Sequence, residues 1–213
     1  MCLKLVLFRE KESRAPSHGE LNRHHLYFIP GIKIQPLLLK IPKKTYDYVL
    51  ITSSNALRFK KKWPVARRWI AIGRSTQKFI ESRISNVERT PKAGSEGVLK
   101  FFKQARGKRR ASIFFPRSKI AEPKLIEALR KLGYRVCVRH SYNTQILSVR
   151  RPFMKLLQQK KIDGIYFTSP STVRAFCRSF SPKERRNLPL KYFCIGETTF
   201  NEMKRLGLKR SRI

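Results

Sequence analysis

The chain has 213 residues, a length that fits one large domain or two small ones. Hydrophobic residues make up 41% of it, enough for a buried core, and the charged share of 29% is ordinary. The charge balance is unusual, because 49 Lys and Arg against 13 Asp and Glu give a formal net charge of +36. Such a surface attracts polyanions: nucleic acid, acidic membranes or a small substrate with many carboxylates. The basic residues are spread along the chain, which also fits a generally basic solvated surface with no specific ligand, whereas a nucleic-acid-binding tail concentrates them in one block.

The cysteines, the histidines and the first residues argue against further classes. No cysteine belongs to a CxxC pair, and three of the four lie in or beside apolar runs, which favours free thiols in a reducing cytoplasm over disulfides or zinc. The cysteines are Cys2, Cys137, Cys177 and Cys194. The spacing of His24, His25 and His140 predicts no metal site. The first apolar run is short and followed at once by charge, so it predicts a β-strand rather than a signal peptide or membrane span.

Short apolar runs closed by turn residues recur along the chain and predict strands. In chain order they lie at residues 3–8, 48–52, 68–73, 111–116, 134–138, 164–168 and 192–196. Residues 122–133 carry Leu125, Leu129 and Leu132 at helical spacing and end at Gly133, so they predict an amphipathic helix. Near-continuous apolar strands that alternate with helices indicate an α/β fold, with parallel sheets covered on both faces.

Two pairs of similar segments occur in the same order. Residues 47–58 (DYVLITSSNALR) are similar to residues 163–174 (DGIYFTSPSTVR), and residues 72–76 (IGRST) to residues 195–199 (IGETT). The sequence therefore predicts the same series twice: a buried strand ending in Thr-Ser, a helix start, a second strand and another helix start. One match could reflect the preference of helix N-termini for Ser, Thr and Gly. Two matches in order indicate an internal duplication and two similar domains, with equivalent strand ends in each.

The joints between strands and helices are candidate anion sites. In open parallel sheets, ligands bind beyond the carboxyl ends of the strands. Helix N-termini there present unpaired N–H groups and a partial positive charge, and Ser and Thr add hydroxyl donors. Two such domains facing one another would offer four anion-binding ends around one cleft, which suits a ligand with carboxylates around its rim.

Taken together, the segments DYVLITSSNALRF, IAIGRST, LIEALRKLGYRVCVRHSYNT, DGIYFTSPSTVRAF and CIGETT resemble the uroporphyrinogen-III synthase family. The resemblance covers roughly residues 45–207, with a first strand at 3–8. It implies two flavodoxin-like parallel-sheet domains joined by a two-stranded connector, with the chain crossing twice, near residues 34–41 and 140–147. The implied division is residues 1–35 with 147–213 for the first domain, 39–141 for the second, and 36–38 and 142–146 for the connectors.

The resemblance also implies an activity. Enzymes of this family are lyases of tetrapyrrole and haem biosynthesis, which close the linear hydroxymethylbilane into uroporphyrinogen III and invert the last pyrrole ring, without a metal or organic cofactor. The substrate is a polycarboxylate, which agrees with the anion-binding joints and the positive charge. Loss of its terminal hydroxyl leaves an electrophilic azafulvene that closes without help to the uninverted ring, so catalysis requires positioning, with a spiro intermediate. A cytoplasmic monomer with no specific nucleic-acid or membrane partner is implied as well.

The family's functional positions can be carried over to matching residues of this chain. Tyr142, in HSYNT, matches a tyrosine that assists loss of the hydroxyl, although a connector tyrosine with a hydrogen-bonded hydroxyl is an equal alternative. Arg117 and Lys119 follow a predicted strand and could meet carboxylates or lie in a solvated loop. The remaining positions are cleft and strand-end hydroxyls, each of which could be only a helix cap. They are Thr52, Ser53, Thr76, Thr168, Ser169, Thr198 and Thr199.

Two features depart from the family pattern. Residues 9–30 are polar and weakly patterned where the family has an amphipathic helix, and the chain ends at Ile213 where the family continues with another helix. We therefore expect a reduced terminal domain. Two alternatives stay open: an inactive paralogue, and a basic two-domain protein that binds nucleic acid or another polyanion. The absence of RRM, zinc and helix-turn-helix signatures argues against the latter.

Overall fold

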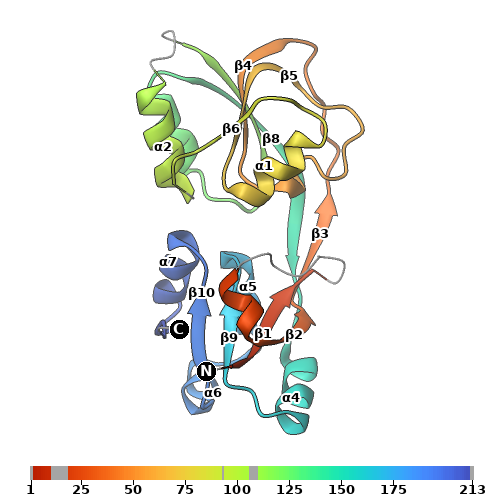
Figure 1. Ribbon diagram of the computed structural model, residues 1–213, viewed down its shortest axis with the longest axis vertical. Helices are drawn as coiled ribbons and strands as arrows, with labels where there is room; N and C mark the ends of the chain where they lie inside the picture. Colours follow the sequence, from red (N-terminus) through yellow and green to blue (C-terminus); the bar gives the residue numbers. More distant parts are fainter. Residues whose placement is uncertain (1, 11–18, 93, 106–109, 212–213) are drawn as a thin grey trace. The chain divides into compact units, whose positions relative to one another are not determined.

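The computed structural model describes residues 2–10, 19–92, 94–105 and 110–211. The chain divides into two compact units (Figure 1). Unit 1 combines Met1–Lys33 with Thr144–Ile213, and unit 2 is Ile34–Asn143. All seven predicted strands are present, and the helix predicted at 122–133 is α3 (Lys124–Lys131). It forms because Leu125 and Leu129 lie one turn apart and are both buried.

Unit 2 is built around a six-stranded sheet of order β3-β8-β7-β4-β5-β6. Its strands are β3 (Ile32–Pro36), β4 (Thr45–Ile51), β5 (Val65–Ala71), β6 (Val87–Arg89), β7 (Ser112–Ser118) and β8 (Arg135–Ile146). The pairs from β4 to β8 are parallel, as predicted. In chain order these five strands are arranged 3-2-1-4-5, whereas the order in flavodoxin itself is 2-1-3-4-5. The order differs because the chain moves outward from β4 through β5 to β6 before it returns to the other side of β4 as β7.

The core of unit 2 lies between this sheet and two helices. From the sheet come Tyr48, Leu50 and Phe115, and from α2 (Gly94–Gln104) comes Phe102, which also packs edge-on against Tyr48. α3 adds its two buried leucines to the same cluster. The third helix, α1 (Arg74–Glu81), contacts β5 and β6.

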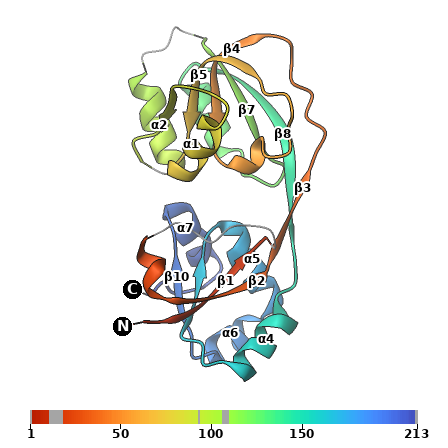
Figure 2. The ribbon, with the colours of Figure 1, turned by 45° about the vertical axis from the view of Figure 1, so that its right-hand side comes forward.

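Unit 1 contains a four-stranded parallel sheet of order β10-β9-β1-β2 (Figure 2). Its strands are β1 (Lys4–Arg9), β2 (His25–Pro30), β9 (Gly164–Phe167) and β10 (Lys191–Cys194). Its helices are η1 (Gly19–Arg23), α4 (Arg150–Gln159), α5 (Pro170–Ser179), α6 (Pro182–Asn187) and α7 (Glu197–Arg205). One sheet face packs on α4, α5 and α7 through aromatic residues such as Phe8, Phe153 and Phe176, and the other packs on Leu21 of η1.

The segment 9–30 contains no helix of the expected kind among its described residues, since 11–18 lie outside them and the rest forms the end of β1, η1 and β2. β2 was not predicted because it lies at the sheet edge and alternates weakly, with Phe28 48% exposed. Ile213 also lies outside the described residues.

The chain passes between the units twice, through β3 and through β8. These strands are antiparallel neighbours, since the Leu37 N–H donates to the Ser141 carbonyl and the Leu147 N–H to the Gly31 carbonyl, both at 3.0 Å. None of the helices in the described ranges combines the length and apolar character that a bilayer span requires.

The duplicated segments occupy equivalent positions. Thr52 directly follows β4, and Thr168 directly follows β9. Each copy also begins with an aspartate that supports the neighbouring strand: Asp163 accepts the Lys4 N–H at 2.7 Å, and Asp47 accepts the Ser112 N–H at 2.8 Å. The shared role of the two aspartates explains why both copies start with Asp.

The two copies differ after their Thr-Ser residues. The second opens α5, with Pro170 at its first position, as predicted. The first opens only the 3-10 helix η2 (Ser54–Ala56), so the helix expected there is wrong. Pro64 cannot occupy the interior of a helix, so a helix that begins at Ser54 would have to end before it.

Candidate active site

The carboxyl ends of β4, β7 and β8 bring the predicted residues of unit 2 together. Ser53 caps η2, and its Oγ accepts the Asn55 N–H at 3.3 Å. The same hydroxyl lies near the Tyr142 phenol and lowers its pKa. The structure therefore brings together two residues that lie 89 positions apart and that the sequence indicates separately.

Tyr142 owes its position to an irregularity in the sheet. β7 pairs Arg117 with His140 but Ser118 with Tyr142, so Ser141 is an extra residue on β8. Such a bulge redirects the side chains beyond it. The phenol is 8% exposed, and burial raises its pKa. The Ser53 hydroxyl and the positive charge of Arg117 act in the opposite direction, lowering that pKa.

Arg117 is buried, with 6% of its surface exposed, so it does not lie in a solvated loop. Its Nη2 donates to the Glu122 carbonyl at 2.6 Å, and its guanidinium carbon lies 5.0 Å from the centre of the Phe115 ring. Its Nη1 is buried without a hydrogen-bond partner among the described residues. Burial lowers the pKa of the guanidinium. Lys119, two residues on, is exposed.

The sequence analysis did not predict three further polar groups near this point. The hydroxyls of Ser118 and Ser141 and the Oδ1 of Asn143 are buried, and none has a hydrogen-bond partner within the described ranges. Buried polar atoms without a hydrogen-bond partner lower the stability of the fold, and they mark places that water or a ligand can occupy. Their place in the sequence could have identified these three residues as candidates, since each is adjacent to Arg117 or Tyr142.

The two IGxxT segments form equivalent helix starts. Gly73 and Gly196 precede α1 and α7 with φ of 79° and 70°, and neither helix has a side-chain cap. Because glycine carries no Cβ it adopts this left-handed backbone freely, and the helix N–H groups stay accessible. The third residue of each helix, Thr76 or Thr199, is buried, whereas Thr198 is exposed.

In unit 1, Thr168 and Ser169 lie at the carboxyl end of β9 and are half-buried. The Ser169 N–H donates to Thr172 Oγ1 at 3.3 Å, and that hydroxyl donates to the Ser169 carbonyl at 2.7 Å. The Oγ of Ser169 is buried without a hydrogen-bond partner in the described part of the chain. Thr168, Ser169, Thr198 and Thr199 therefore belong to unit 1, and the other predicted residues belong to unit 2.

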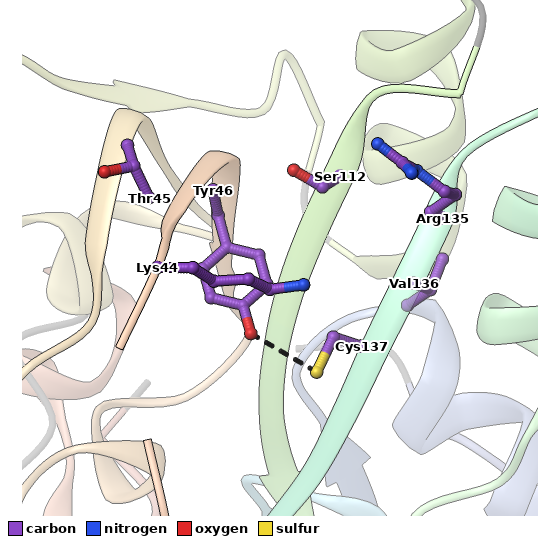
Figure 3. A pocket seen from close by; sticks show the side chains of 7 residues that line it. All are labelled: Lys44, Thr45, Tyr46, Ser112, Arg135, Val136 and Cys137. Atoms are coloured by element: carbon purple, nitrogen blue, oxygen red, sulfur yellow. Dashed lines mark hydrogen bonds between the residues drawn. The ribbon is translucent and has the colours of Figure 1, made fainter. Parts of the chain in front are cut away.

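A cavity of about 440 Å³ lies at the other end of the unit 2 strands (Figure 3). Tyr46, near the start of β4, lies in it and donates its hydroxyl to Cys137 Sγ at 3.5 Å, drawn as the dashed line. The cavity contains no predicted site residue. Its lining residues are Lys44, Thr45, Tyr46, Ser112, Arg135, Val136 and Cys137. The part of the chain that the structure describes holds no group of three His, Cys, Asp or Glu side chains that could bind a metal.

Comparison with known proteins identifies the family. A family model described as uroporphyrinogen-III synthase HemD matches residues 20–213. The chain belongs to the uroporphyrinogen-III synthase family. A uroporphyrinogen-III synthase from Chlorobaculum parvum is 25% identical over 228 positions, which cover 97% of this chain and 91% of the relative.

Solved structures of this family have the same fold. A mutant uroporphyrinogen III synthase from the extremely thermophilic bacterium Thermus thermophilus superposes with a TM-score of 0.64 at 15% identity, covering 98% of this chain and 91% of the other. A uroporphyrinogen-III synthetase from Helicobacter pylori gives a TM-score of 0.61 at 15% identity, with the same coverage. Uroporphyrinogen-III synthases are cyclising lyases of tetrapyrrole biosynthesis, so the resemblance noted in the sequence is confirmed. The alternatives, a nucleic-acid-binding protein or an inactive paralogue, are not favoured.

Proposed function

We propose that this uroporphyrinogen-III synthase uses Tyr142 as the proton donor that assists loss of the hydroxyl from hydroxymethylbilane. The observation that carries the proposal is the setting of the phenol, which is buried at the carboxyl end of the sheet near the Ser53 hydroxyl, a group that lowers its pKa. A general acid needs a transferable proton and a partner that stabilises the conjugate base, and Ser53 supplies the second.

The proposed step conserves atoms and electrons. Tyr142 gives its proton to the terminal hydroxyl, the carbon–oxygen bond breaks, and its electron pair leaves with water. The lone pair of the nitrogen in the pyrrole that carries the hydroxymethyl group, at the opposite end of the chain from the last ring, forms the new double bond of the azafulvene. The substituted carbon of the last ring then attacks, and the macrocycle reaches uroporphyrinogen III through the spiro intermediate. A proton lost by the macrocycle restores the phenol, so the net loss is one water. Positioning supplies most of the selectivity for the inverted ring.

The carboxylates of the substrate would be held by hydroxyls and helix N–H groups at the carboxyl ends of the strands. The accessible helix starts after Gly73 and Gly196 support this assignment. The buried Oγ of Ser169, which has no hydrogen-bond partner in the described ranges, supports it further, because this hydroxyl could donate a hydrogen bond to a carboxylate oxygen. The residues proposed for these contacts are Thr52, Ser53, Thr76, Thr168, Ser169, Thr198 and Thr199. Arg117 lies at the same sheet end and is proposed for a carboxylate contact as well, because its buried Nη1 has no hydrogen-bond partner in the described ranges.

The organisation expected from the sequence forms part of the same proposal: domains at 1–35 with 147–213 and at 39–141, with connectors at 36–38 and 142–146. The division of the chain after Lys33 and after Asn143 supports it. We propose a monomeric enzyme in the cytoplasm. The four cysteines are free, and three of them are buried or half-buried, which suits a reducing compartment.

Replacing Tyr142 by Phe tests the catalytic role. We expect the rate of closure to isomer III to fall about ten- to a hundredfold, because the general acid is lost while positioning remains. The assay supplies hydroxymethylbilane and separates isomer III from isomer I. Tyr46→Phe is the matched control, since it removes another buried hydroxyl in unit 2 at the opposite end of the strands. An unchanged rate in Tyr142→Phe would leave Tyr142 with only a structural role.

The salt dependence of binding tests the role of the +36 charge. Exposed charges are screened over about 8 Å at physiological ionic strength, so binding of uroporphyrinogen III should weaken as salt rises. Contacts from N–H groups at helix starts are screened less, so part of the affinity should survive. A random DNA duplex bound by counterion release should lose affinity by orders of magnitude. Tight, salt-resistant DNA binding without tetrapyrrole binding would contradict the proposal.

A further inference from the structure

Unit 2 has two extended segments where the internal duplication would place two helices. Residues 47–58 match residues 163–174, an offset of 116 positions (163 against 47), so residues 34–43 correspond to α4 and residues 54–63 to α5. In unit 1 those two helices bury aromatic side chains against the sheet. In unit 2 the corresponding residues form the end of β3, the single turn η2 and chain without regular structure.

These two segments lie side by side along unit 2. At one end Lys60 Nζ donates to the Leu37 carbonyl, and at the other end Thr45 pairs with Val65 where β4 and β5 begin. The indole of Trp63 anchors them, since it packs on one aromatic ring of β5 and one of α1 with 5.6 Å between ring centres in each case. We call the two segments the strip, which comprises residues 37–44 and 58–65.

The strip exposes three large apolar side chains. Leu38 is 86% exposed, Val65 63% and Phe59 40%. A single exposed apolar residue is common on a soluble protein, whereas three within one short strip indicate a surface that meets an apolar partner. The other exposed side chains of this kind in the described ranges are scattered over different elements; they are Phe28, Ile120, Leu132 and Met154.

Lysines accompany these apolar side chains, and acidic residues do not. Between residues 21 and 80 the sequence has a single carboxylate, Asp47, which accepts hydrogen bonds from Ser112 and lies 3.9 Å from Arg67. None of the exposed lysines of the strip forms an ion pair with a residue in the described part of the chain. These lysines are Lys40, Lys43, Lys44, Lys61 and Lys62.

Exposed apolar side chains among lysines match the surface of a membrane that contains anionic lipids. The apolar groups enter the boundary between headgroups and acyl chains, while the ammonium groups stay at the level of the lipid phosphates. A nucleic acid would use the lysines but not Leu38, because it is bound through phosphate contacts and base stacking, and leucine offers neither.

We propose that the strip is a peripheral membrane-binding surface, which docks on anionic lipid headgroups and inserts Leu38 and Phe59 between them. Binding of this kind is reversible and leaves the enzyme in the cytoplasm, since only side chains enter the lipid. The family resemblance implies no membrane partner, so this surface goes beyond the proposed function. It does not depend on the proposed role of Tyr142.

Co-sedimentation with lipid vesicles tests the proposal. The unchanged chain should bind vesicles made of equal parts of phosphatidylglycerol and phosphatidylcholine, and should not bind phosphatidylcholine alone. Lys61→Gln combined with Lys62→Gln should weaken binding about tenfold at low salt, because each lysine is attracted by the anionic surface. Leu38→Ser combined with Phe59→Ser should weaken it about tenfold at both low and moderate salt, because apolar insertion is not screened.

Matched changes in unit 1 separate the strip from the general charge of the chain. Lys160→Gln combined with Lys161→Gln removes another pair of adjacent exposed lysines, and Met154→Ser removes another exposed apolar side chain. Each control should change binding by less than about twofold. Equal losses in the controls and in the strip variants would assign the attraction to the whole +36 chain and overturn the proposal.

The apolar changes decide between a membrane and a nucleic acid. If the lysine changes weaken vesicle binding but the serine changes do not, insertion is excluded and the proposal is again overturned. The same dependence on Lys61 and Lys62 in the binding of a DNA duplex would then identify a nucleic-acid surface.

Fluorescence supplies a direct readout of insertion. Phe59→Trp places an indole on the strip, and its spectrum is obtained by subtracting that of the unchanged chain, which has two tryptophans. We expect a blue shift on the mixed vesicles and quenching by phosphatidylcholine with brominated acyl chains, whereas Met154→Trp should show neither effect. An indole at position 59 that stays unshifted and unquenched on bound vesicles would refute insertion.

The closure assay separates this surface from the proposed active site. Without vesicles, Leu38→Ser and the lysine variants should form isomer III at the rate of the unchanged chain, whatever the outcome for Tyr142→Phe. Circular dichroism and thermal melting confirm that each variant is folded. If Phe59→Ser does not fold, Leu38→Ser alone repeats the comparison at the most exposed of the three apolar positions.

Discussion

Replacing Glu202 by Gln removes the carboxylate that joins α5 to α7 in unit 1. Glu202 is 5% exposed, and its Oε1 accepts from Arg174 Nε on α5 at 2.7 Å. Arg205, one turn further along α7, donates to both carboxylate oxygens at 2.7 and 2.9 Å. The N-terminal ends of these helices carry Ser169 and Thr199, so the ion pairs support the candidate substrate contacts of unit 1.

The expected loss of stability in Glu202→Gln follows from the pKa of the Glu202 carboxyl. Arg205 and Arg174 lower the pKa of Glu202 to about 2 from its ordinary 4.5, against the opposing effect of burial. A depression of this size corresponds to roughly 3 kcal/mol of stability at neutral pH. The Arg205 side chain is 60% exposed and solvent screens its share, whereas that of Arg174 is 23% exposed. We therefore expect Glu202→Gln to cost about 2 kcal/mol, which lowers Tm by about 4–8 °C for a chain of this length.

The pH dependence has a defined sign. A carboxyl whose pKa is lower in the folded than in the unfolded state stabilises the fold above the unfolded value, and that contribution disappears as the pH falls through the folded value. The difference in Tm between the unchanged chain and Glu202→Gln should thus be full at about pH 6 and shrink between about pH 4.5 and pH 2.

Differential scanning calorimetry at a series of pH values measures both effects. Glu96→Gln is the control, because Glu96 forms an exposed pair with Lys92 on the surface of unit 2 and should shift Tm by about 1 °C or less. A Glu202→Gln Tm equal to that of the unchanged chain at about pH 6, or a difference that persists undiminished at about pH 2, would refute the reasoning.

Two further predictions concern the fold. Asp163→Ala removes the acceptor of the Lys4 N–H and should lower the free energy of unfolding by about 1–2 kcal/mol. Asp47→Ala should lower it somewhat less, because the Asp47 side chain is partly exposed. Urea denaturation measures both, and an unchanged free energy of unfolding in either variant would contradict the role of that aspartate in supporting the neighbouring strand. Gly97→Ala should prevent stable folding, because the alanine Cβ would lie 1.6 Å from the Lys92 carbonyl oxygen. This clash outweighs the preference of about 1 kcal/mol that alanine has over glycine in a helix. A soluble variant with an unchanged Tm would contradict that geometry.

Most strands, one helix and the internal duplication could be predicted from the sequence, because each depends on local residue patterns. The seven strands were predictable because buried parallel strands are continuous apolar runs, and α3 because its leucines recur at helical spacing. The duplication was readable because both copies need the same residues at the same joints: an aspartate beside the next strand, Thr-Ser at the strand end and a glycine before a helix. The family was recognisable from these segments taken in order.

Only the tertiary structure decided how the active-site residues meet. The proximity of Ser53 to Tyr142 depends on β7 lying between β4 and β8, and on an extra residue at Ser141 that no periodicity reveals. The burial of Arg117, which a sequence places as readily in a solvated loop, depends on the same register. Apolar spacing determines which segments become strands, but strand order and register are set by packing between segments far apart in the chain, and a shift of one residue sends every later side chain to the opposite face.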